Sequence, residues 1–354
     1  MTLEDLGWSP TREEAFAEHA ARGRFPARVT VPHRGMCWAL CAAGEVEAGV
    51  AGKLRRRGEL PAAGDWVAVA PATGAGRALI DAVLPRATRF SRKTPGRART
   101  EQVVAANIDT VFVVTAVGRD LNLRRIERYL ALAWESGAVP VVVISKLDVD
   151  EHPEQTLAEV AAVAPGVAVL PVSGRTGEGV EALRGYLGPG RTVALVGSSG
   201  VGKSTLINAL LGERRQRVDE VGAWGKGRHT TSERELIPVP GGGLVLDTPG
   251  LREIQLFDAA SGIDETFTDL DALAASCRFR DCRHDGEPDC AVREAIGRGE
   301  VPQARVDAQN KLLDEQRFRE TQLDRQAQSE IKRSQREIQR ALRAHLDAKY
   351  GRKE

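Results

Sequence analysis

The stretch Gly197-Ser198-Ser199-Gly200-Val201-Gly202-Lys203-Ser204 fits the G-x-x-x-x-G-K-[ST] pattern of a phosphate-binding loop. It follows the apolar run 192–196 and precedes a helix-like segment, 204–211, so it has the strand–loop–helix context that the pattern requires. Glycines let backbone N–H groups face phosphate oxygens, and the helix adds the positive end of its dipole. We expect Lys203 to neutralise the β- and γ-phosphates and the Ser204 hydroxyl to bind Mg²⁺. The predicted nucleotide contacts are the eight residues of this loop and Thr205.

Two downstream segments fit the switch regions of a nucleotide hydrolase. The apolar run 244–246 ends in Asp247-Thr248-Pro249-Gly250, a D-x-x-G pattern. We expect Asp247 to hold Mg²⁺ through water and the Gly250 N–H to sense the γ-phosphate. The glycine-spaced segment 222–231 ends in two threonines, one of which would complete the Mg²⁺ shell in the triphosphate state. We assign this role to Thr231, with Thr230 as the alternative.

A guanine-reading segment is predicted upstream of the phosphate loop. Ser145-Lys146-Leu147-Asp148 follows an apolar run and is close to N-K-x-D, with Ser145 in place of Asn. The Asp148 carboxylate can accept from guanine N1–H and the 2-amino group, donors that adenine lacks, and the Lys146 stem would pack over the base. Ser173-Gly174, again at a strand end, resembles the S-A-K loop that contacts the guanine oxygen.

Both guanine segments precede Gly197, whereas the usual order places them after the D-x-x-G loop. A permuted chain keeps a three-dimensional site if the old termini lie close in space. The sequence therefore predicts a circularly permuted GTPase. An ATPase or a kinase that uses the same phosphate loop is the alternative within enzymes, and a non-catalytic RNA-binding module is the alternative outside them.

The chain divides into five expected parts. Residues 1–26 form a helical lead, and short β-type runs in 27–90 predict a small barrel, for which we expect an OB-fold. Residues 91–107 are expected to be a basic linker. Apolar strands alternating with helices predict an α/β domain with a doubly wound sheet over 108–258. Residues 259–354 are expected to be a mainly helical, metal-binding domain that ends in a basic helix.

Three cysteines and a histidine predict a metal centre. Cys277, Cys282, His284 and Cys290 supply three thiolates and one imidazole, a tetrahedral Zn²⁺ set that leaves no position for water, so we expect one structural ion. Charged neighbours leave little apolar material for a core in this segment, which favours metal as its organiser. Cys37 and Cys41 lie on one face of a predicted strand and are expected in the core.

Composition limits the other possibilities. Lysine and arginine number 50 against 49 acidic residues, so the formal net charge is +1 and a basic surface must be local. No apolar stretch approaches the roughly twenty residues of a membrane span, and the first residues do not fit a signal peptide. We expect a cytoplasmic protein that contacts no membrane.

The order of barrel, guanine segments, phosphate loop, D-T-P-G and Cys-His cluster resembles the RsgA (YjeQ) family of ribosome small-subunit-dependent GTPases. Further strings that carry the resemblance are Gly64-Asp65-Trp66-Val67, Phe90-Ser91-Arg92-Lys93 and Gly227-Arg228-His229-Thr230-Thr231. The resemblance implies an OB-fold, a permuted GTPase domain and a zinc domain. It also implies GTP hydrolysis that the small subunit and its rRNA stimulate during late subunit maturation, with GTP and GDP as ligands. We expect a monomer.

The catalytic residues are assigned as Lys203, Thr231 and His229. Ras-like proteins place a water-orienting Gln after D-x-x-G, but this chain has Leu251, so intrinsic turnover is expected to be slow. We hypothesise that ribosomal RNA positions His229 to orient the attacking water. A purely structural histidine is the alternative.

Overall fold

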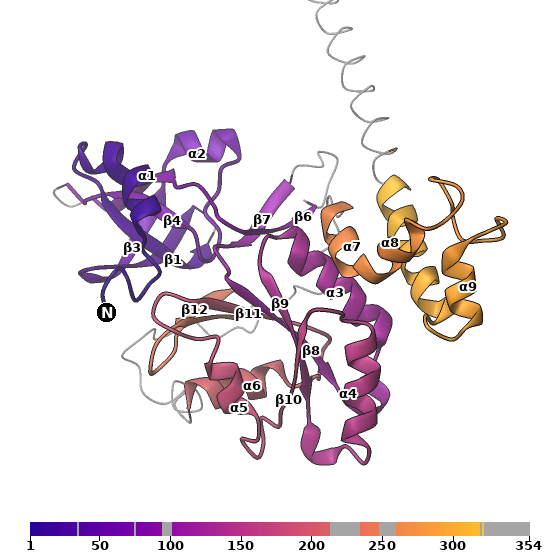
Figure 1. Cartoon of the computed structure of the whole chain (residues 1–354). Coiled ribbons are helices and arrows are strands. Elements are labelled where there is room, and N and C mark those ends of the chain that lie inside the picture. Colours follow the sequence, from indigo (N-terminus) through magenta and orange to yellow (C-terminus); the bar gives the residue numbers. More distant parts are fainter. Residues whose placement is uncertain are drawn as a thin grey trace, which may run out of the picture.

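The computed structural model describes residues 1–33, 35–73, 76–93, 101–212, 234–247, 260–318 and 321. Three bodies follow one another along the chain, a barrel, an α/β sheet domain and a helical C-terminal domain, and the sheet domain lies between the other two (Figure 1). Among the described residues, no helix has both the length and the apolar character needed to cross a bilayer.

Five strands close the N-terminal barrel: β1 Phe25–His33, β2 Met36–Cys41, β3 Gly44–Val50, β4 Trp66–Ala70 and β5 Ala78–Val83. Their order is β1-β2-β3-β5-β4, with β1 also paired to β4, and the β3–β5 pair is parallel. A short helix, α2 Gly52–Arg57, connects β3 to β4. The predicted β-runs thus form a closed five-stranded barrel of the expected OB type. Cys37 is buried in its core, as expected, and Cys41 packs against that core.

The N-terminal lead packs onto the barrel. Helix α1, Pro10–Ala20, begins where the Ser9 hydroxyl accepts from the Arg12 N–H, and it buries Phe16. The indole of Trp8 meets that of Trp66 edge-on, with ring centroids 4.7 Å apart. The buried guanidinium of Arg28 donates to the carbonyl oxygens of Leu6, Gly64 and Asn107. This one side chain therefore joins the lead, the barrel and the entrance to the sheet domain.

The segment 91–107 is not the simple linker that its charge predicts. Strands β6 Arg89–Lys93 and β7 Glu101–Ala106 form an antiparallel ribbon, and residues 94–100 lie outside the described part. The ribbon exists because its ends are apolar: Phe90, Val104 and Ala105 are buried in the large core cluster. The basic composition of the segment hid these buried positions.

The central domain has a six-stranded sheet made of β8 Thr110–Ala116, β9 Val139–Ser145, β10 Ala168–Pro171, β11 Thr192–Val196, β12 Glu235–Pro238 and β13 Leu244–Asp247. The order is β10-β9-β8-β11-β13-β12, in which β12 is antiparallel and the other neighbours are parallel. The chain winds outward from β8 in one direction and then, from β11, in the other. The switch point of this doubly wound sheet therefore lies between β8 and β11.

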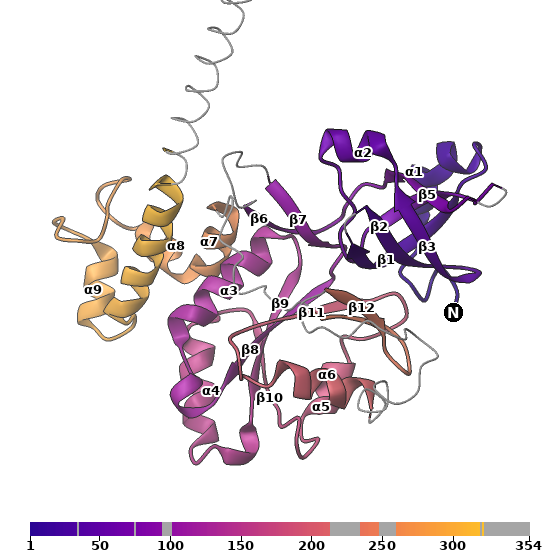
Figure 2. The same ribbon diagram turned by 180° about the vertical axis from the view of Figure 1, so that it is seen from behind.

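Helices cover both faces of the sheet. Helices α3 Leu123–Glu135 and α4 Pro153–Ala162 lie on one face, and α5 Val180–Arg184 and α6 Lys203–Leu211 lie on the other (Figure 2). Each face has its own apolar core: Val111 and Val113 pack with α3, while Phe112 and Val114 pack with α5 and α6. Two 3₁₀ turns, Gly118–Asp120 and Leu147–Val149, follow the carboxyl ends of β8 and β9.

The C-terminal domain packs on α3. Its helices are α7 Ala260–Thr266, α8 Thr268–Ala274 and α9 Ala291–Gly297, and residues 303–318 are also helical. A methyl group added at Gly262 would collide with the carbonyl oxygen of Ala131, so α7 and α3 touch backbone to backbone. The basic segment predicted after residue 321 lies outside the described residues.

Gly64 provides a test of the barrel junction. It has φ +86°, and an added Cβ would overlap the carbonyl oxygen of Ala106 in the ribbon. We expect Gly64→Ala to destabilise the protein by about 2–4 kcal/mol, since left-handed strain and overpacking add. Gly23 has φ +71° and open space where a methyl group would be added, so it is the matched control, and Gly23→Ala should cost about 1 kcal/mol. Equal shifts of the thermal unfolding midpoint would contradict the collision.

Candidate functional site

The carboxyl ends of four parallel strands bring the predicted nucleotide segments to one edge of the sheet. Ser145 ends β9, Ser173 follows β10, Gly197 follows β11 and Asp247 ends β13. Strand β11 pairs with both β8 and β13, so the phosphate loop starts next to the switch point. Ligands of open α/β sheets bind in the crevice at this position.

The phosphate loop has the backbone that its glycines predict. Gly197 has φ 151°, and a side chain there would collide with the carbonyl oxygen of Val114 on β8. Gly202, with φ 94°, is the N-cap of α6, whose first residue is Lys203. The Lys203 ammonium folds back over the loop and donates to the Gly197 carbonyl oxygen at 2.8 Å. Ser204 and Thr205 are exposed in the first turn of α6. The start of α6 and the Lys203 ammonium therefore face the loop.

The two guanine segments meet at Asp148. One oxygen of its carboxylate accepts from the Ser173 hydroxyl at 2.6 Å, and the other accepts from Nε of Arg175 at 2.8 Å. These two bonds, first that from Ser173, lower the pKa of Asp148 below its ordinary value. The side chain of Asp148 is 12% exposed, and the guanidinium that covers it, that of Arg175, is 74% exposed. The carboxylate is held ionised between two loops.

Gly174 lies against the first turn of α6, and Lys146 pairs with a residue that follows β8. A methyl group at Gly174 would lie 3.1 Å from the Thr205 methyl, so the second guanine segment abuts the first turn of α6. Lys146 adopts φ 61°, and its ammonium pairs with the half-exposed Asp120 at 3.3 Å. The loop after β10 and the phosphate loop are thus neighbours.

Ser145, which replaces the usual Asn, connects the guanine segment to the phosphate loop. The side chain is buried, and its hydroxyl contacts the carbonyl oxygens of Val201 and of Thr115, the latter at 3.0 Å. A hydroxyl has a single hydrogen to donate, so these two acceptors share it. Ser145 therefore connects the end of β9 to the backbone of β8 and of the phosphate loop.

Parts of the predicted machinery lie outside the described residues. These are His229, Thr230, Thr231 and Gly250, in segments 213–233 and 248–259. Asp247 is described: it ends β13 opposite Glu235 of the edge strand, one strand away from the phosphate loop. Asp247 thus ends the strand that pairs with β11, and its proposed role at Mg²⁺ stays a prediction.

The sequence is similar to one family along most of its length. It matches the RsgA GTPase family over residues 83–257. The small ribosomal subunit biogenesis GTPase RsgA of Opitutus terrae is 49% identical over 338 residues, which cover 92% of this chain and 92% of the relative. The chain belongs to the RsgA GTPase family.

Other RsgA relatives and solved structures agree with this assignment. The small ribosomal subunit biogenesis GTPase RsgA of Streptomyces coelicolor is 43% identical over 99% of this chain and 96% of its own length. YjeQ from Thermotoga maritima, at 28% identity, has a TM-score of 0.62 and covers 83% of this chain and 98% of that one. YloQ, a circularly permuted GTPase, shares the fold at 23% identity, with a TM-score of 0.60 over 84% of this chain and 96% of that one.

The Cys-His cluster of this RsgA chain is assembled. The ligand atoms of Cys277, Cys282, His284 and Cys290 lie within 4.8 Å of one another, so the cluster could hold a metal ion. His284 adopts φ 61°, and its Nδ1 lies 3.3 Å from Sγ of Cys290. Burial lowers the pKa of His284, which favours the neutral imidazole that metals require.

Glu287 is a residue of this centre that sequence reasoning missed. Its carboxylate accepts from the backbone N–H groups of Arg283, Asp285 and Gly286 at 2.9–3.1 Å. These bonds lower the pKa of Glu287 to about 2. The carboxylate thus fixes the turn that carries His284. A Glu three residues after a ligand His carries no signal of its own in the sequence.

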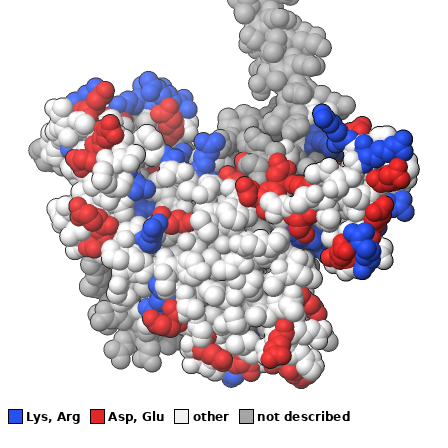
Figure 3. Space-filling view, in the orientation of Figure 1, with Lys and Arg blue, Asp and Glu red and all other residues white. Residues whose placement is uncertain are grey.

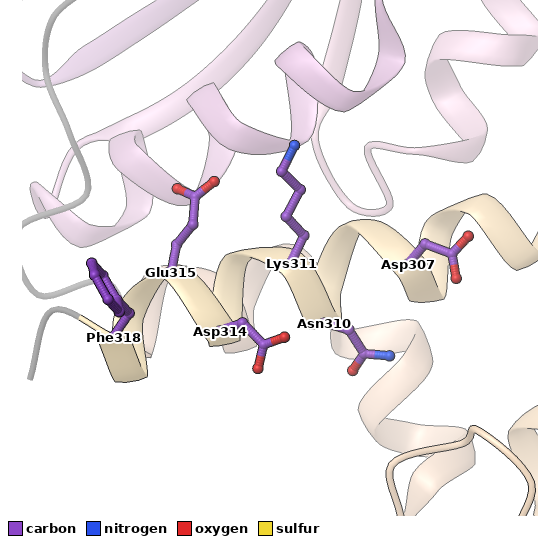
Figure 4. A pocket seen from close by; sticks show the side chains of 6 residues that line it. All are labelled: Asp307, Asn310, Lys311, Asp314, Glu315 and Phe318. Carbon is purple, nitrogen blue, oxygen red and sulfur yellow. The ribbon is translucent and has the colours of Figure 1, made fainter. Parts of the chain in front are cut away.

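A shallow pocket along the C-terminal helix contains none of the predicted nucleotide residues. Its lining is made of Asp307, Asn310, Lys311, Asp314, Glu315 and Phe318 (Figure 4). These residues recur at helical spacing along one element, and Phe318 is largely exposed. The pocket is a surface of the helix and lies apart from the strand ends.

The cluster predicts the metal content of the purified protein. We expect about one ion per chain, and Cys290→Ser should reduce this to below about a tenth, because a tetrahedral site loses one of its ligands. Elemental analysis of the full-length protein measures the ratio. Cys41→Ser is the matched control, since Cys41 lies in the barrel and should leave the metal content unchanged. A metal-free wild-type protein would contradict the assignment.

Proposed function

We propose that this protein is a GTPase that acts in maturation of the small ribosomal subunit, with turnover stimulated by the subunit. One observation carries the proposal: Asp148, Ser173, Lys203 and Asp247 share one edge of one sheet although the chain visits them in permuted order. The relatives that are 40–49% identical are small ribosomal subunit biogenesis GTPases, which supports the biological context.

The phosphate loop binds the triphosphate in this proposal. Backbone N–H groups of residues 197–202 surround the phosphates, and Lys203, now bonded to loop carbonyls, turns toward the β- and γ-phosphates. The exposed Ser204 hydroxyl and Asp247 hold Mg²⁺, Asp247 through water. Thr205, next along α6, lies beside Gly174 and closes the site toward the base.

Guanine is read by Asp148. A carboxylate offers about four lone-pair positions, and Ser173 occupies one of them. The guanidinium of Arg175 is 74% exposed, so its pair with Asp148 is a surface ion pair of low stability. Guanine N1–H and the 2-amino group can take the place of Arg175 at the carboxylate. Ser145 acts as a positioning residue, because its hydroxyl ties this segment to Val201.

Hydrolysis depends on the segments that carry Gly250, Thr231 and His229. In the proposal Thr231 completes the Mg²⁺ shell in the triphosphate state, and Gly250 senses the γ-phosphate. His229 orients the attacking water once ribosomal RNA positions it, which fits the presence of Leu251 where Ras-like proteins have Gln.

Zn²⁺ is the ion that suits the Cys-His cluster. Three thiolates and one imidazole match its tetrahedral preference, and four protein ligands make the centre structural. The ion would hold the loop between α8 and α9, whose exposed residues are mostly charged. Bound Zn²⁺ supplies folding free energy to this domain and takes no part in hydrolysis.

One local basic surface supports contact with ribosomal RNA. Arg55, Arg56 and Arg57 are exposed on α2 of the barrel. The exposed arginines of the Cys-His loop alternate with acidic residues, and Arg278 pairs with Asp289. Blue side chains lie at the top of the barrel, whereas blue and red side chains are mixed over the C-terminal domain (Figure 3). With a net charge of only +1, RNA binding must come from such patches. The protein is proposed to work as a monomer in the cytoplasm, where ribosomal subunits mature.

Asp148→Asn tests base recognition. The amide can donate to the 2-oxygen of xanthine but cannot accept both guanine donors, so preference should move from GTP to xanthosine triphosphate by at least about tenfold. Competition binding of the two nucleotides to wild-type and variant protein measures the shift. An unchanged preference would favour an ATPase or kinase. Asp150→Asn, close by on the same loop, is the control and should bind GTP normally.

Lys203→Ala separates an enzyme from a binding module. Loss of the ammonium should reduce GTP turnover by at least about a hundredfold, since it removes charge stabilisation of the transferring phosphate. Sedimentation with small ribosomal subunits should persist, because the barrel and metal-domain surfaces are intact. Turnover with and without subunits is measured in parallel. Retained turnover in the variant would refute the proposed role of the loop.

His229→Ala tests the water-orienting hypothesis. Subunit-stimulated turnover should fall by about a hundredfold while GTP affinity stays the same, since general-base or orienting groups contribute about that factor. Single-turnover assays with saturating subunits give the rate. A rate equal to that of the wild type would assign His229 a structural role.

A further inference from the structure

One helical turn of α3 touches both the phosphate loop and the C-terminal domain. The Arg125 guanidinium donates to the Ser198 hydroxyl in the second position of the loop. Two residues later, the buried Glu127 carboxylate accepts from Nη1 of Arg305 at 2.9 Å. Arg125 is itself held at the start of the helix, where its N–H donates to the Asn122 side chain. Both contacts therefore move with the same rigid turn.

Arg305 is fully engaged at the domain junction. Its side chain is 1% exposed, and its five N–H groups all find acceptors: two on Asp269, one on Glu127 and one each on the carbonyl oxygens of Thr266 and Val163. The guanidinium also stacks over the Phe267 ring at 4.9 Å. A buried charge tolerates little displacement from its partners, so this junction has a defined geometry.

Glu127 is bound from both sides. Arg124 donates to both of its oxygens at 2.7 and 2.8 Å, and Arg305 donates to one of them. Burial raises the pKa of Glu127, an effect that the two guanidinium groups oppose. The carboxylate thus connects a half-exposed arginine of α3 with the buried arginine of the C-terminal domain.

The junction leads on to the metal centre. Asp269 lies in the first turn of α8, and that helix ends three residues before Cys277. A second ion pair joins α3 to the C-terminal helix, between Arg128 and Glu315 at 3.0 Å. Figure 4 shows Glu315 and Lys311 pointing from this helix toward the sheet domain. A displacement of the C-terminal domain would therefore also displace α3.

We propose that Arg305 and Arg125 are positioning residues for GTP hydrolysis. Arg305 couples the position of the C-terminal domain to Glu127 on α3, and Arg125 of the same helix couples α3 to Ser198 of the phosphate loop. Docking of the metal-binding domain on the small subunit then sets the geometry of the loop and the rate of turnover. This inference rests on the proposed function, because the small subunit is taken as the partner that moves the C-terminal domain. The contacts through α3 are those of the described residues.

The kinetic test uses Arg305→Lys in the full-length protein. Lysine keeps the charge but is a point donor that cannot span Glu127 and Asp269 together. We expect subunit-stimulated kcat to fall about tenfold, within the range typical of coupled sites, with KM and basal kcat changed less than about twofold. Arg298→Lys is the matched control, since Arg298 pairs with Glu300 on the same domain, and it should behave as the wild type.

A double-mutant cycle tests whether one route is involved. If both residues act through α3, Arg125→Ala with Arg305→Lys should lose no more stimulation than the worse single variant. Losses that multiply to about a hundredfold would show independent effects and overturn the proposal, as would full stimulation in Arg305→Lys. If Arg305→Lys loses metal, Glu127→Leu with Arg305→Met replaces the buried pair by apolar groups and must show the same loss.

A subunit-free measurement separates this inference from the proposed function. Hydrogen exchange of residues 260–274 is followed in the wild type and in Arg125→Ala, each saturated with a non-hydrolysable GTP analogue. We expect the analogue to change exchange at least about twofold in the wild type and to have no effect in the variant. If small subunits do not stimulate turnover of the wild type but the analogue still changes its hydrogen exchange, only the ribosomal role is refuted. No effect of the analogue in the wild type would refute the route through α3.

Discussion

In a parallel sheet, every strand delivers its carboxyl end to the same edge, and the rest of this structure depends on that constraint. Strands β9, β10, β11 and β13 end at one edge of the sheet whatever the order in which the chain makes them. Nucleotide recognition needs only that these ends be neighbours. Circular permutation therefore leaves the site intact and changes instead what lies after it. Here the D-x-x-G segment is followed directly in the sequence by the C-terminal domain, so the segment predicted to sense the nucleotide and the domain with the Cys-His cluster are adjacent in the chain.

The domain junctions use buried arginines in the same way. Arg28 joins the lead, the barrel and the sheet domain through three carbonyl oxygens, and Arg305 joins the sheet domain to the helical domain through two carboxylates and two carbonyl oxygens. A guanidinium that leaves water needs acceptors for its N–H donors, which restricts the arrangement of its partners. Burial lowers the pKa of Arg28 to about 9, which reflects the cost of removing this charge from water. Such junctions fix geometry more than they add stability.

The motifs predicted local geometry of the candidate site, because each depends on short-range backbone chemistry. Gly197 and Gly202 adopt positive φ as a phosphate loop requires, and the four cluster ligands meet because they are separated by only a few residues. The ribbon of β6 and β7 was missed, since the basic residues of the segment outweighed its few apolar positions in the sequence. The sequence shows only that Ser145 stands in place of Asn, whereas the structure shows that its hydroxyl contacts the backbone of Val201, 56 residues further along the chain. No local pattern encodes such a pairing.

By itself, the sequence determined the family of the protein, the succession of barrel, α/β sheet and helical segments, and the Cys-His cluster that could hold a metal ion. These follow from residue types at fixed spacing, where physical chemistry leaves few alternatives. Tertiary structure alone decided which charges meet. Arg175 lies on Asp148, Arg125 on Ser198 and Arg305 on Glu127, and the last two pairs join residues 73 and 178 positions apart. Surface and interface charges carry no periodic signal, because their partners are selected by how helices pack on the sheet and not by their neighbours in the chain.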